Sequence, residues 1–173
     1  MRLAFFALVF SLIAPCELLA APAKSTTSAN APKQVLFVCT GNFFRSRFAE
    51  IAFNTLEKSP RWAATSRGLD TAHTRKTPIS PLVPAELARR NIAPSPALER
   101  PPMQLTQADL DHADLVVLLD GEEHEPKLKA KFQTVSSAKL RSWSVHDSPK
   151  MNPADAFAAI WQQVEALVTE LAH

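Results

Sequence analysis

Tyrosine is absent from this chain of 173 residues, and cysteine is rare. The two cysteines are Cys16, which lies in an apolar N-terminal segment, and Cys39. If that segment is removed as a leader, Cys39 is the only thiol and no disulfide can form within the chain. The scarcity therefore excludes a disulfide-stabilised scaffold and any reaction that needs a second thiol of the same chain.

Charge of one sign is not concentrated in any part of the sequence. The chain has 19 Lys and Arg against 17 Asp and Glu, and no basic block is interleaved with aromatic residues, so we expect no nucleic-acid partner. The five histidines lack the spacing of metal ligands. Acidic residues gather only at Glu122, Glu123 and Glu125, which we interpret as a solvated helix start. We therefore expect neither a metal nor another cofactor.

The apolar run at residues 3–14 is too short to span a bilayer and follows the basic Arg2. This pattern predicts a secretion signal over residues 1–23, with the mature chain beginning near Ala21 or Lys24. Pro15 directly before Cys16 argues against a lipoprotein acceptor site. We expect an exported protein, periplasmic or secreted, without membrane association after cleavage; a retained interfacial anchor is the alternative.

Residues 24–33 are rich in Ser, Thr, Ala and Pro and are predicted to form a flexible linker. The remaining segment, residues 34–173, has the length of one domain. Apolar patterns predict strands over residues 34–38, 61–66, 115–119 and 141–145, and helices over residues 45–58, 81–91, 122–132 and 153–171. This alternation predicts a single three-layer α/β domain, a four-stranded parallel sheet with helices on both faces.

Local signals define several of these boundaries. Ser80 is the expected N-cap of the second helix, with Pro81 in its first turn. Thr106 and Asp109 have the spacing of a capping box for a short additional helix. The four prolines between residues 94 and 102 predict an extended loop.

The segment that joins the first strand to the first helix carries the clearest chemical signal. Cys39 and Arg45 lie six positions apart in it, with Gly41 and Asn42 between them. A loop that closes onto a helix N-terminus can direct successive backbone N–H groups at an anion. We expect Gly41 to give the loop its conformational freedom and Asn42 to accept a left-handed conformation.

The side chains of this loop suit attack on a phosphate ester. Arg45 offers a planar fork for two phosphate oxygens and keeps its charge at working pH. The positive field of the loop favours the thiolate of Cys39, which is the nucleophilic form, and Ser46 can donate a hydrogen bond to it. The alternative is that Cys39 is a small buried hydrophobic residue, but the flanking strand, the helix and the Gly-Asn pair favour the phosphate loop.

The stretch Val35-Leu36-Phe37-Val38-Cys39-Thr40-Gly41-Asn42-Phe43-Phe44-Arg45-Ser46, with Ala49-Glu50, resembles the active-site loop of the low-molecular-weight protein tyrosine phosphatases. Residues 66–68, 113–120 and 145–149 and the long final helix resemble that family more weakly. The resemblance implies a nucleophile at Cys39, a phosphate clamp at Arg45 and a supporting hydroxyl at Ser66. It also implies a phosphate-binding loop that includes Thr40, Gly41, Asn42, Phe43, Phe44 and Ser46.

Asp147 stands where the family has its general acid, which protonates the leaving group and then activates water. It follows the fourth predicted strand, and so belongs at the same sheet edge as Cys39. The alternative for a lone loop aspartate is a solvated turn residue. Ser148 separates Asp147 from Pro149, unlike the family pattern. Because this acid must start protonated, we expect the highest activity on the acid side of neutrality.

Other departures from the family concern the substrate. Family tyrosines that line the cleft are absent, so we expect Phe43, His146 or Met151 to form its wall. Phe44 replaces a second cysteine that many members carry. The family's histidine that braces the loop has no clear counterpart between residues 92 and 100. We interpret Asp120 as structural.

These patterns predict a phosphomonoester hydrolase that forms a thiophosphate intermediate at Cys39. Its substrate would be a phosphotyrosine protein or a small aryl or other phosphate ester. Two alternatives remain: an oxyanion receptor with weak turnover, and an arsenate-reductase-like enzyme that uses an external thiol.

Overall fold

The computed structural model describes residues 31–72, 74, 77–132 and 135–173. The predicted signal peptide and most of the predicted linker lie outside the described residues. The elements, in chain order, are β1 (Lys33–Cys39), α1 (Arg45–Leu56), β2 (Trp62–Gly68), α2 (Leu82–Arg89), η1 (Pro96–Glu99), α3 (Gln107–His112), β3 (Leu115–Leu118), α4 (Gly121–Lys131), η2 (Ser137–Lys139), β4 (Leu140–Ser142) and α5 (Pro153–Leu171).

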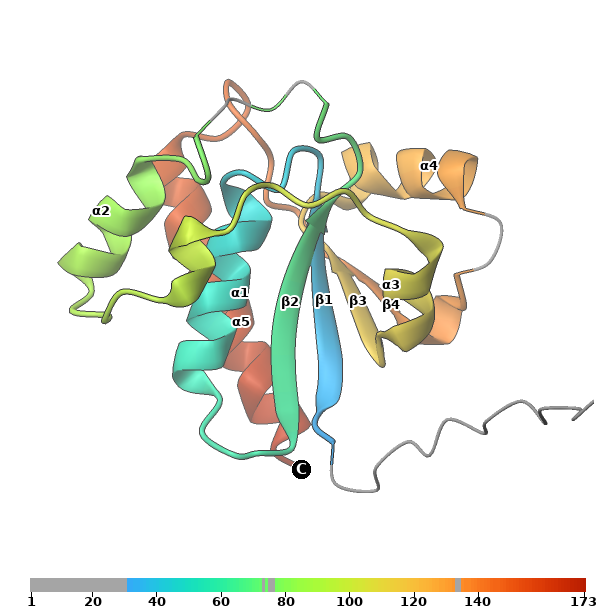
Figure 1. The fold of residues 1–173 in the computed structure, drawn as a ribbon, viewed down its shortest axis with the longest axis horizontal. Coiled ribbons are helices and arrows are strands. Elements are labelled where there is room, and N and C mark those ends of the chain that lie inside the picture. Colours follow the sequence, from blue (N-terminus) through green and yellow to red (C-terminus); the bar gives the residue numbers. More distant parts are fainter. Residues whose placement is uncertain (1–30, 73, 75–76, 133–134) are drawn as a thin grey trace, which may run out of the picture.

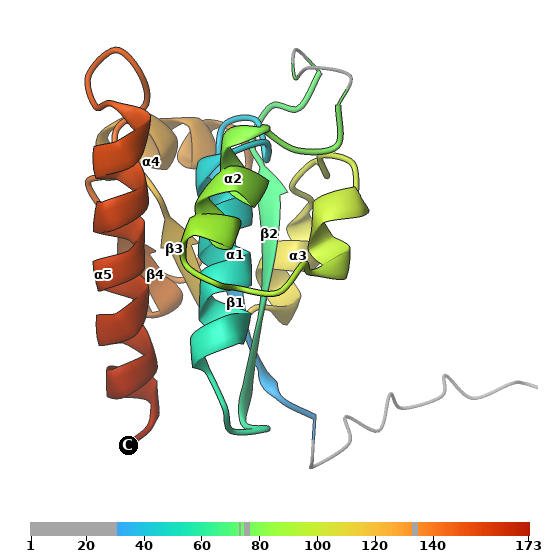
Figure 2. The ribbon, with the colours of Figure 1, turned by 90° about the vertical axis from the view of Figure 1, so that its left-hand side faces the viewer.

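The four strands form one parallel sheet in the order β2-β1-β3-β4. Helices α1, α2 and α5 cover one face, and α3 and α4 lie on the other (Figures 1 and 2). This arrangement confirms the predicted three-layer α/β fold. Within the described part of the chain, no helix combines the length and the apolar character needed to cross a bilayer.

Successive side chains of β1 point to opposite faces of the sheet and belong to two separate hydrophobic clusters. Val35 and Phe37 pack with residues of α1 and α5, whereas Leu36 and Val38 pack with residues of α3, β3 and α4. A strand buried on both faces reads as a continuous apolar run, which is why β1 was predictable. On the first face, α5 contributes the buried side chains of Phe157, Ile160, Val164 and Leu167.

Three local predictions differ from the structure. β4 is only three residues long; beyond it, the amides of Trp143 and Val145 still donate to the carbonyls of residues 118 and 119, and Ser144 forms a bridge with Asp120. Helix α2 begins at Leu82 with Pro81 at the N-cap position, although the Ser80 hydroxyl still accepts from the Leu82 amide at 3.4 Å. The proline-rich loop contains the 3₁₀ turn η1, because Pro96 suits a first-turn position and the Ser95 side chain caps it. The capping box of Thr106 and Asp109 is confirmed.

The sheet order places β1 at the centre, beside β3. The connections leave these two strands in opposite directions, so this is the point where an open α/β sheet forms a crevice at its carboxyl edge. The segments that follow β1, β3 and β4 therefore meet at one edge, and they carry Cys39, Asp120 and Asp147.

Candidate active site

The loop between β1 and α1 curls so that its carbonyl groups point outward. The carbonyls of Cys39, Thr40, Gly41 and Phe43 accept hydrogen bonds from residues 69, 70, 74 and 80, at 2.8–3.0 Å. Among the described residues, none accepts a hydrogen bond from the amides of residues 41–46. Carbonyls that point outward leave these amides directed inward, at the N-terminus of α1. This is the geometry of an anion-binding nest.

Of the predictions for two loop residues, the one for Asn42 is confirmed and the one for Gly41 is wrong. Asn42 adopts a left-handed conformation with φ of 50°, as predicted. Gly41 does not have a positive φ, so the prediction that it supplies unusual backbone freedom is wrong. Gly68 is the glycine that the loop requires, because a Cβ there would lie 2.8 Å from the Thr40 carbonyl oxygen and 2.9 Å from the Asn42 nitrogen.

Cys39 lies at the base of the nest, with its side chain 3% exposed. Its Sγ is 3.0 Å from the Ser46 Oγ. Asn42 donates from Nδ2 to Ser46 at 3.1 Å and to Ser66 at 2.8 Å. The hydroxyl of Ser46 is thereby held against the sulfur by partners that are themselves buried.

The buried chain of hydrogen bonds continues beneath the loop. Ser66 donates to Glu50 at 2.5 Å, and Arg100 donates to the same carboxylate at 2.7 Å and to Ser66 at 3.2 Å. The Met103 amide donates to the Asn42 side chain at 2.9 Å. Arg100 therefore forms one end of this network, with Glu50 and Ser66 as its acceptors.

Arg45 is 3% exposed and is surrounded by acceptors. Its Nη1 donates to the Val145 carbonyl at 3.0 Å, and its Nη2 donates to Asp147 Oδ2 at 2.9 Å. Glu123 Oε2 lies 3.6 Å from Nη2 and Asp120 Oδ2 lies 3.9 Å from Nη1. The structure thus brings Asp147 to the loop between β1 and α1, although its side chain remains 58% exposed.

Glu123 is a site residue that sequence reasoning missed, because it was interpreted as part of a solvated helix start. Thr40 donates to Glu123 at 2.5 Å, and Lys127 donates to the same oxygen at 2.7 Å. Burial alone would raise the pKa of Glu123, but these two hydrogen bonds, with His124 and Arg45 nearby, lower it to about 2. Glu123 is therefore an anion beside the Arg45 guanidinium at neutral pH.

Two histidines lie beside Asp120. His146 Nδ1 lies 2.9 Å from Asp120 Oδ2, so Asp120 both caps α4 and orients His146. His124 is fully buried, and its Nδ1 accepts from the Asp120 amide at 3.0 Å. Burial, followed by the charge of Arg45, lowers the pKa of His124 to about 4, so it is neutral. Asp120, Glu122 and His146 bring possible metal-ligand atoms within 4.8 Å of one another, a proximity that their spacing in the sequence did not indicate.

The two loop phenylalanines differ in their surroundings. Phe44 packs edge-on against Phe157 of α5, with ring centroids 4.8 Å apart. It fills core space at the position where many relatives carry a second cysteine. Phe43 is half-buried, and Met151 is half-buried beyond Asp147.

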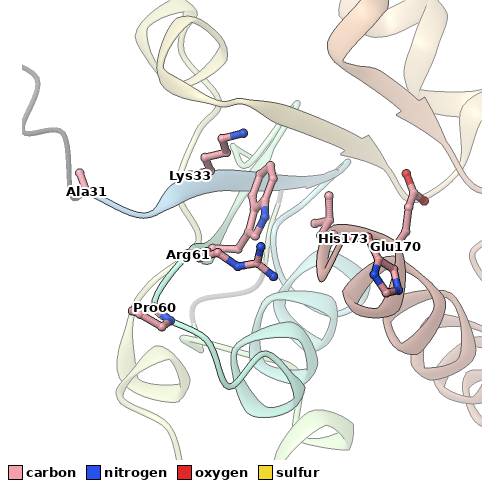
Figure 3. A pocket seen from close by; sticks show the side chains of 8 residues that line it. Ala31, Lys33, Pro60, Arg61, Glu170 and His173 are labelled. Carbon is pink, nitrogen blue, oxygen red and sulfur yellow. The ribbon is translucent and has the colours of Figure 1, made fainter.

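A separate pocket of about 720 Å³ lies at the opposite end of the sheet, where β1 and β2 begin and α5 ends. Figure 3 shows Lys33 and Arg61 beside it, with His173 from the end of α5. It shares no residue with the catalytic loop. The candidate active site is therefore the set of side chains that meet at the carboxyl edge of the sheet, and this pocket is not part of it.

Comparison with known proteins agrees with this geometry. The family model described as low molecular weight phosphotyrosine protein phosphatase matches residues 34–173. The chain belongs to this family. Membership supports phosphatase chemistry in general. No curated protein sequence matches the chain.

Solved structures share the family fold. YfkJ from Bacillus subtilis has a TM-score of 0.72 at 22% identity, over 83% of this chain and 97% of that one. The low-molecular-weight protein tyrosine phosphatase SP-PTP from Streptococcus pyogenes has a TM-score of 0.65 at 23% identity, over 80% of this chain and 90% of that one. An arsenate reductase from Archaeoglobus fulgidus has a TM-score of 0.58 at 26% identity, over 78% and 98%.

Proposed function

We propose that this member of the family hydrolyses phosphate monoesters through a covalent intermediate at Cys39. The observation that supports the proposal most is the convergence of three groups at one sheet edge. These are a thiol 3.0 Å from a hydroxyl, a nest of inward amides, and a guanidinium bonded to Asp147. Such groups supply a nucleophile, transition-state stabilisation and a proton donor.

The first step transfers the phosphoryl group to sulfur. The Cys39 thiolate attacks phosphorus, the S–P bond forms, and the P–O bond to the leaving group breaks as Asp147 donates its proton to the departing oxygen. The loop amides and Arg45 hold the three equatorial oxygens. In the second step, Asp147 takes a proton from water, the water oxygen attacks phosphorus, and the S–P bond breaks. Ser46 then stabilises the thiolate that leaves.

The proposed substrate is an aryl phosphate, either a phosphotyrosine side chain or a small ester. The half-buried Phe43 supports this choice, since a flat ring can stack on it at the loop. We further propose that the enzyme acts after export, in the periplasm or outside the cell, on the basis of its N-terminal residues.

Hydrolysis of para-nitrophenyl phosphate tests the proposal. We expect turnover by the parent protein and at least about a 10³-fold loss in Cys39→Ser, as for other nucleophile deletions. The matched control, made in the full chain so that both cysteines are present, is Cys16→Ser, which should leave turnover unchanged. A folded parent that binds phosphate but hydrolyses no ester would instead indicate an oxyanion receptor.

An arsenate reductase is the second candidate, because one of the similar structures is an enzyme of that name. The chain has only Cys16 besides Cys39, so an external thiol would have to regenerate the enzyme. Arsenate-dependent oxidation of added glutathione would support this function; its absence, together with ester hydrolysis, would exclude it.

A further inference from the structure

Arg47 is a charged side chain that the proposed mechanism does not use. It lies in the first turn of α1, two residues after Arg45, and is 0% exposed. Its guanidinium donates to the Ala97 carbonyl and, at 3.3 Å, to the Pro101 carbonyl. Its Nε has no hydrogen-bond partner, and no carboxylate of the described residues lies within 4.0 Å of it.

A buried cation without a paired anion carries a desolvation cost that its surroundings must offset. Burial, followed by the charge of Arg100, lowers the pKa of Arg47 to about 10. Arg47 therefore keeps its charge at neutral pH. Something close to it must offset the cost of burying that charge.

The surroundings of Arg47 contain more positive than negative charge. Arg100 is the second guanidinium, and among the described residues Glu50 is the carboxylate that acts on Arg47. Glu50 is already bonded to Arg100 at 2.7 Å. One positive charge therefore remains beneath the loop, and the carbonyls of Ala97 and Pro101 are the acceptors that hold it.

Hydrogen bonds connect these cations to the nucleophile. Arg47 fastens the segment 97–101 beneath the loop, and that segment presents Arg100 to Glu50 and Ser66. From Ser66 the contacts run through Asn42 and Ser46 to the Cys39 sulfur. The orientation of the Ser46 hydroxyl at the sulfur thus depends on this pair of arginines.

We propose that Arg47 and Arg100 are positioning residues for the phosphoryl transfer assigned above: their hydrogen bonds anchor the segment 97–101 and the network that holds the Ser46 hydroxyl against the Cys39 sulfur. The catalytic part of this inference rests on the proposed function. Its effect on the thiol does not, because alkylation of the thiol requires no substrate.

The test is the rate of alkylation of Cys39 by iodoacetamide at pH 6.5. We expect Arg47→Met to slow alkylation by about tenfold, because the segment 97–101 loses the hydrogen bonds that anchor it and the Ser46 hydroxyl loses its orientation at the sulfur. Arg47→Lys, which keeps a charged donor, should recover part of the rate. Arg90→Met is the matched control, because its guanidinium is paired with Glu86 and stacks over Trp161.

Arg100→Gln gives a second measurement if Arg47→Met does not fold, because Arg100 is 27% exposed and tolerates replacement better. It should also slow alkylation, and lower kcat more than it changes KM for para-nitrophenyl phosphate. Folded Arg47→Met or Arg100→Gln that alkylates at the parental rate would overturn the inference. A parent without turnover whose variants still show slower alkylation would count against the proposed function alone.

Discussion

Arg45 donates a hydrogen bond of 2.9 Å to Asp147, although 102 residues separate them along the chain. The contact joins the phosphate-binding loop to the segment after β4. The second oxygen of Asp147 accepts from the Ser148 amide at 2.9 Å, so both carboxylate oxygens are held. A phosphate that binds Arg45 must compete with Asp147 for the N–H donors of the guanidinium. We therefore expect substrate binding to free the acid for proton transfer.

Asp147→Asn tests the role of this carboxyl group as acid and base. We expect kcat to fall by about 10²-fold or more, in the range of general acid–base catalysis. The loss should be larger for phenyl phosphate than for para-nitrophenyl phosphate, because the poorer leaving group depends more on protonation. The measurement is kcat for both esters across pH.

Asp114→Asn is the matched control, since Asp114 accepts from the Gln34 amide at 2.8 Å at the other end of the sheet. It should retain parental turnover. Equal losses for both esters in Asp147→Asn would argue that Asp147 only orients Arg45.

Glu123→Gln should strengthen phosphate binding. The Glu123 carboxylate lies 3.6 Å from Arg45 and is ionised at neutral pH, with a pKa of about 2, so it opposes an incoming dianion. The amide keeps a partner for Thr40 but removes the charge. We expect the inhibition constant of inorganic phosphate to fall by about three- to tenfold.

Glu125→Gln controls for this charge change on the same helix, because Glu125 pairs with Lys129. It should leave phosphate inhibition as in the parent. Weaker phosphate binding in Glu123→Gln would show that Glu123 instead supports the loop through Thr40.

Gly68→Ala tests the close contact between β2 and the catalytic loop. Its methyl group would meet the Thr40 oxygen at 2.8 Å and the Asn42 nitrogen at 2.9 Å, so the loop must move. We expect turnover to fall by at least about tenfold, because displacement of about 1 Å in a catalytic group is costly. Circular dichroism should show a folded protein. Parental turnover would mean that the loop accommodates the methyl group.

The buried His124 makes stability depend on pH. Its pKa of about 4 lies below the usual 6.5, so between these values the unfolded state binds a proton that the folded state does not. The free energy of unfolding should fall as pH decreases from 6.5 to 4, by on the order of 3 kcal/mol in total. Urea denaturation at several pH values measures this slope.

His124→Leu should flatten the slope, although it leaves the Asp120 amide without its acceptor and lowers stability at pH 7. His112→Leu, which alters an exposed histidine in α3, should keep the parental slope. A slope that survives in His124→Leu would assign the pH dependence to other groups.

The predictions from sequence were most accurate where the signals were local. Cys39, Arg45 and Ser46 lie in one short loop between a strand with a buried pattern and a helix, so their proximity follows from chain connectivity. Glu123 and Arg100 depend on how distant segments pack. Glu123 was interpreted as part of a solvated helix start, and only the tertiary structure places it and Arg100 against the loop. The brevity of β4 also depends on tertiary structure, since beyond Ser142 the chain keeps backbone hydrogen bonds to residues 118–121 without forming a regular strand.

The central claim is that phosphorus becomes bonded to the sulfur of Cys39. The most direct measurement is mass spectrometry of the protein after rapid acid quenching during turnover of para-nitrophenyl phosphate. The account predicts an added phosphoryl group on the peptide that contains Cys39, and none in Cys39→Ser. Turnover by Cys39→Ser, or phosphorylation of another residue during productive turnover, would contradict it.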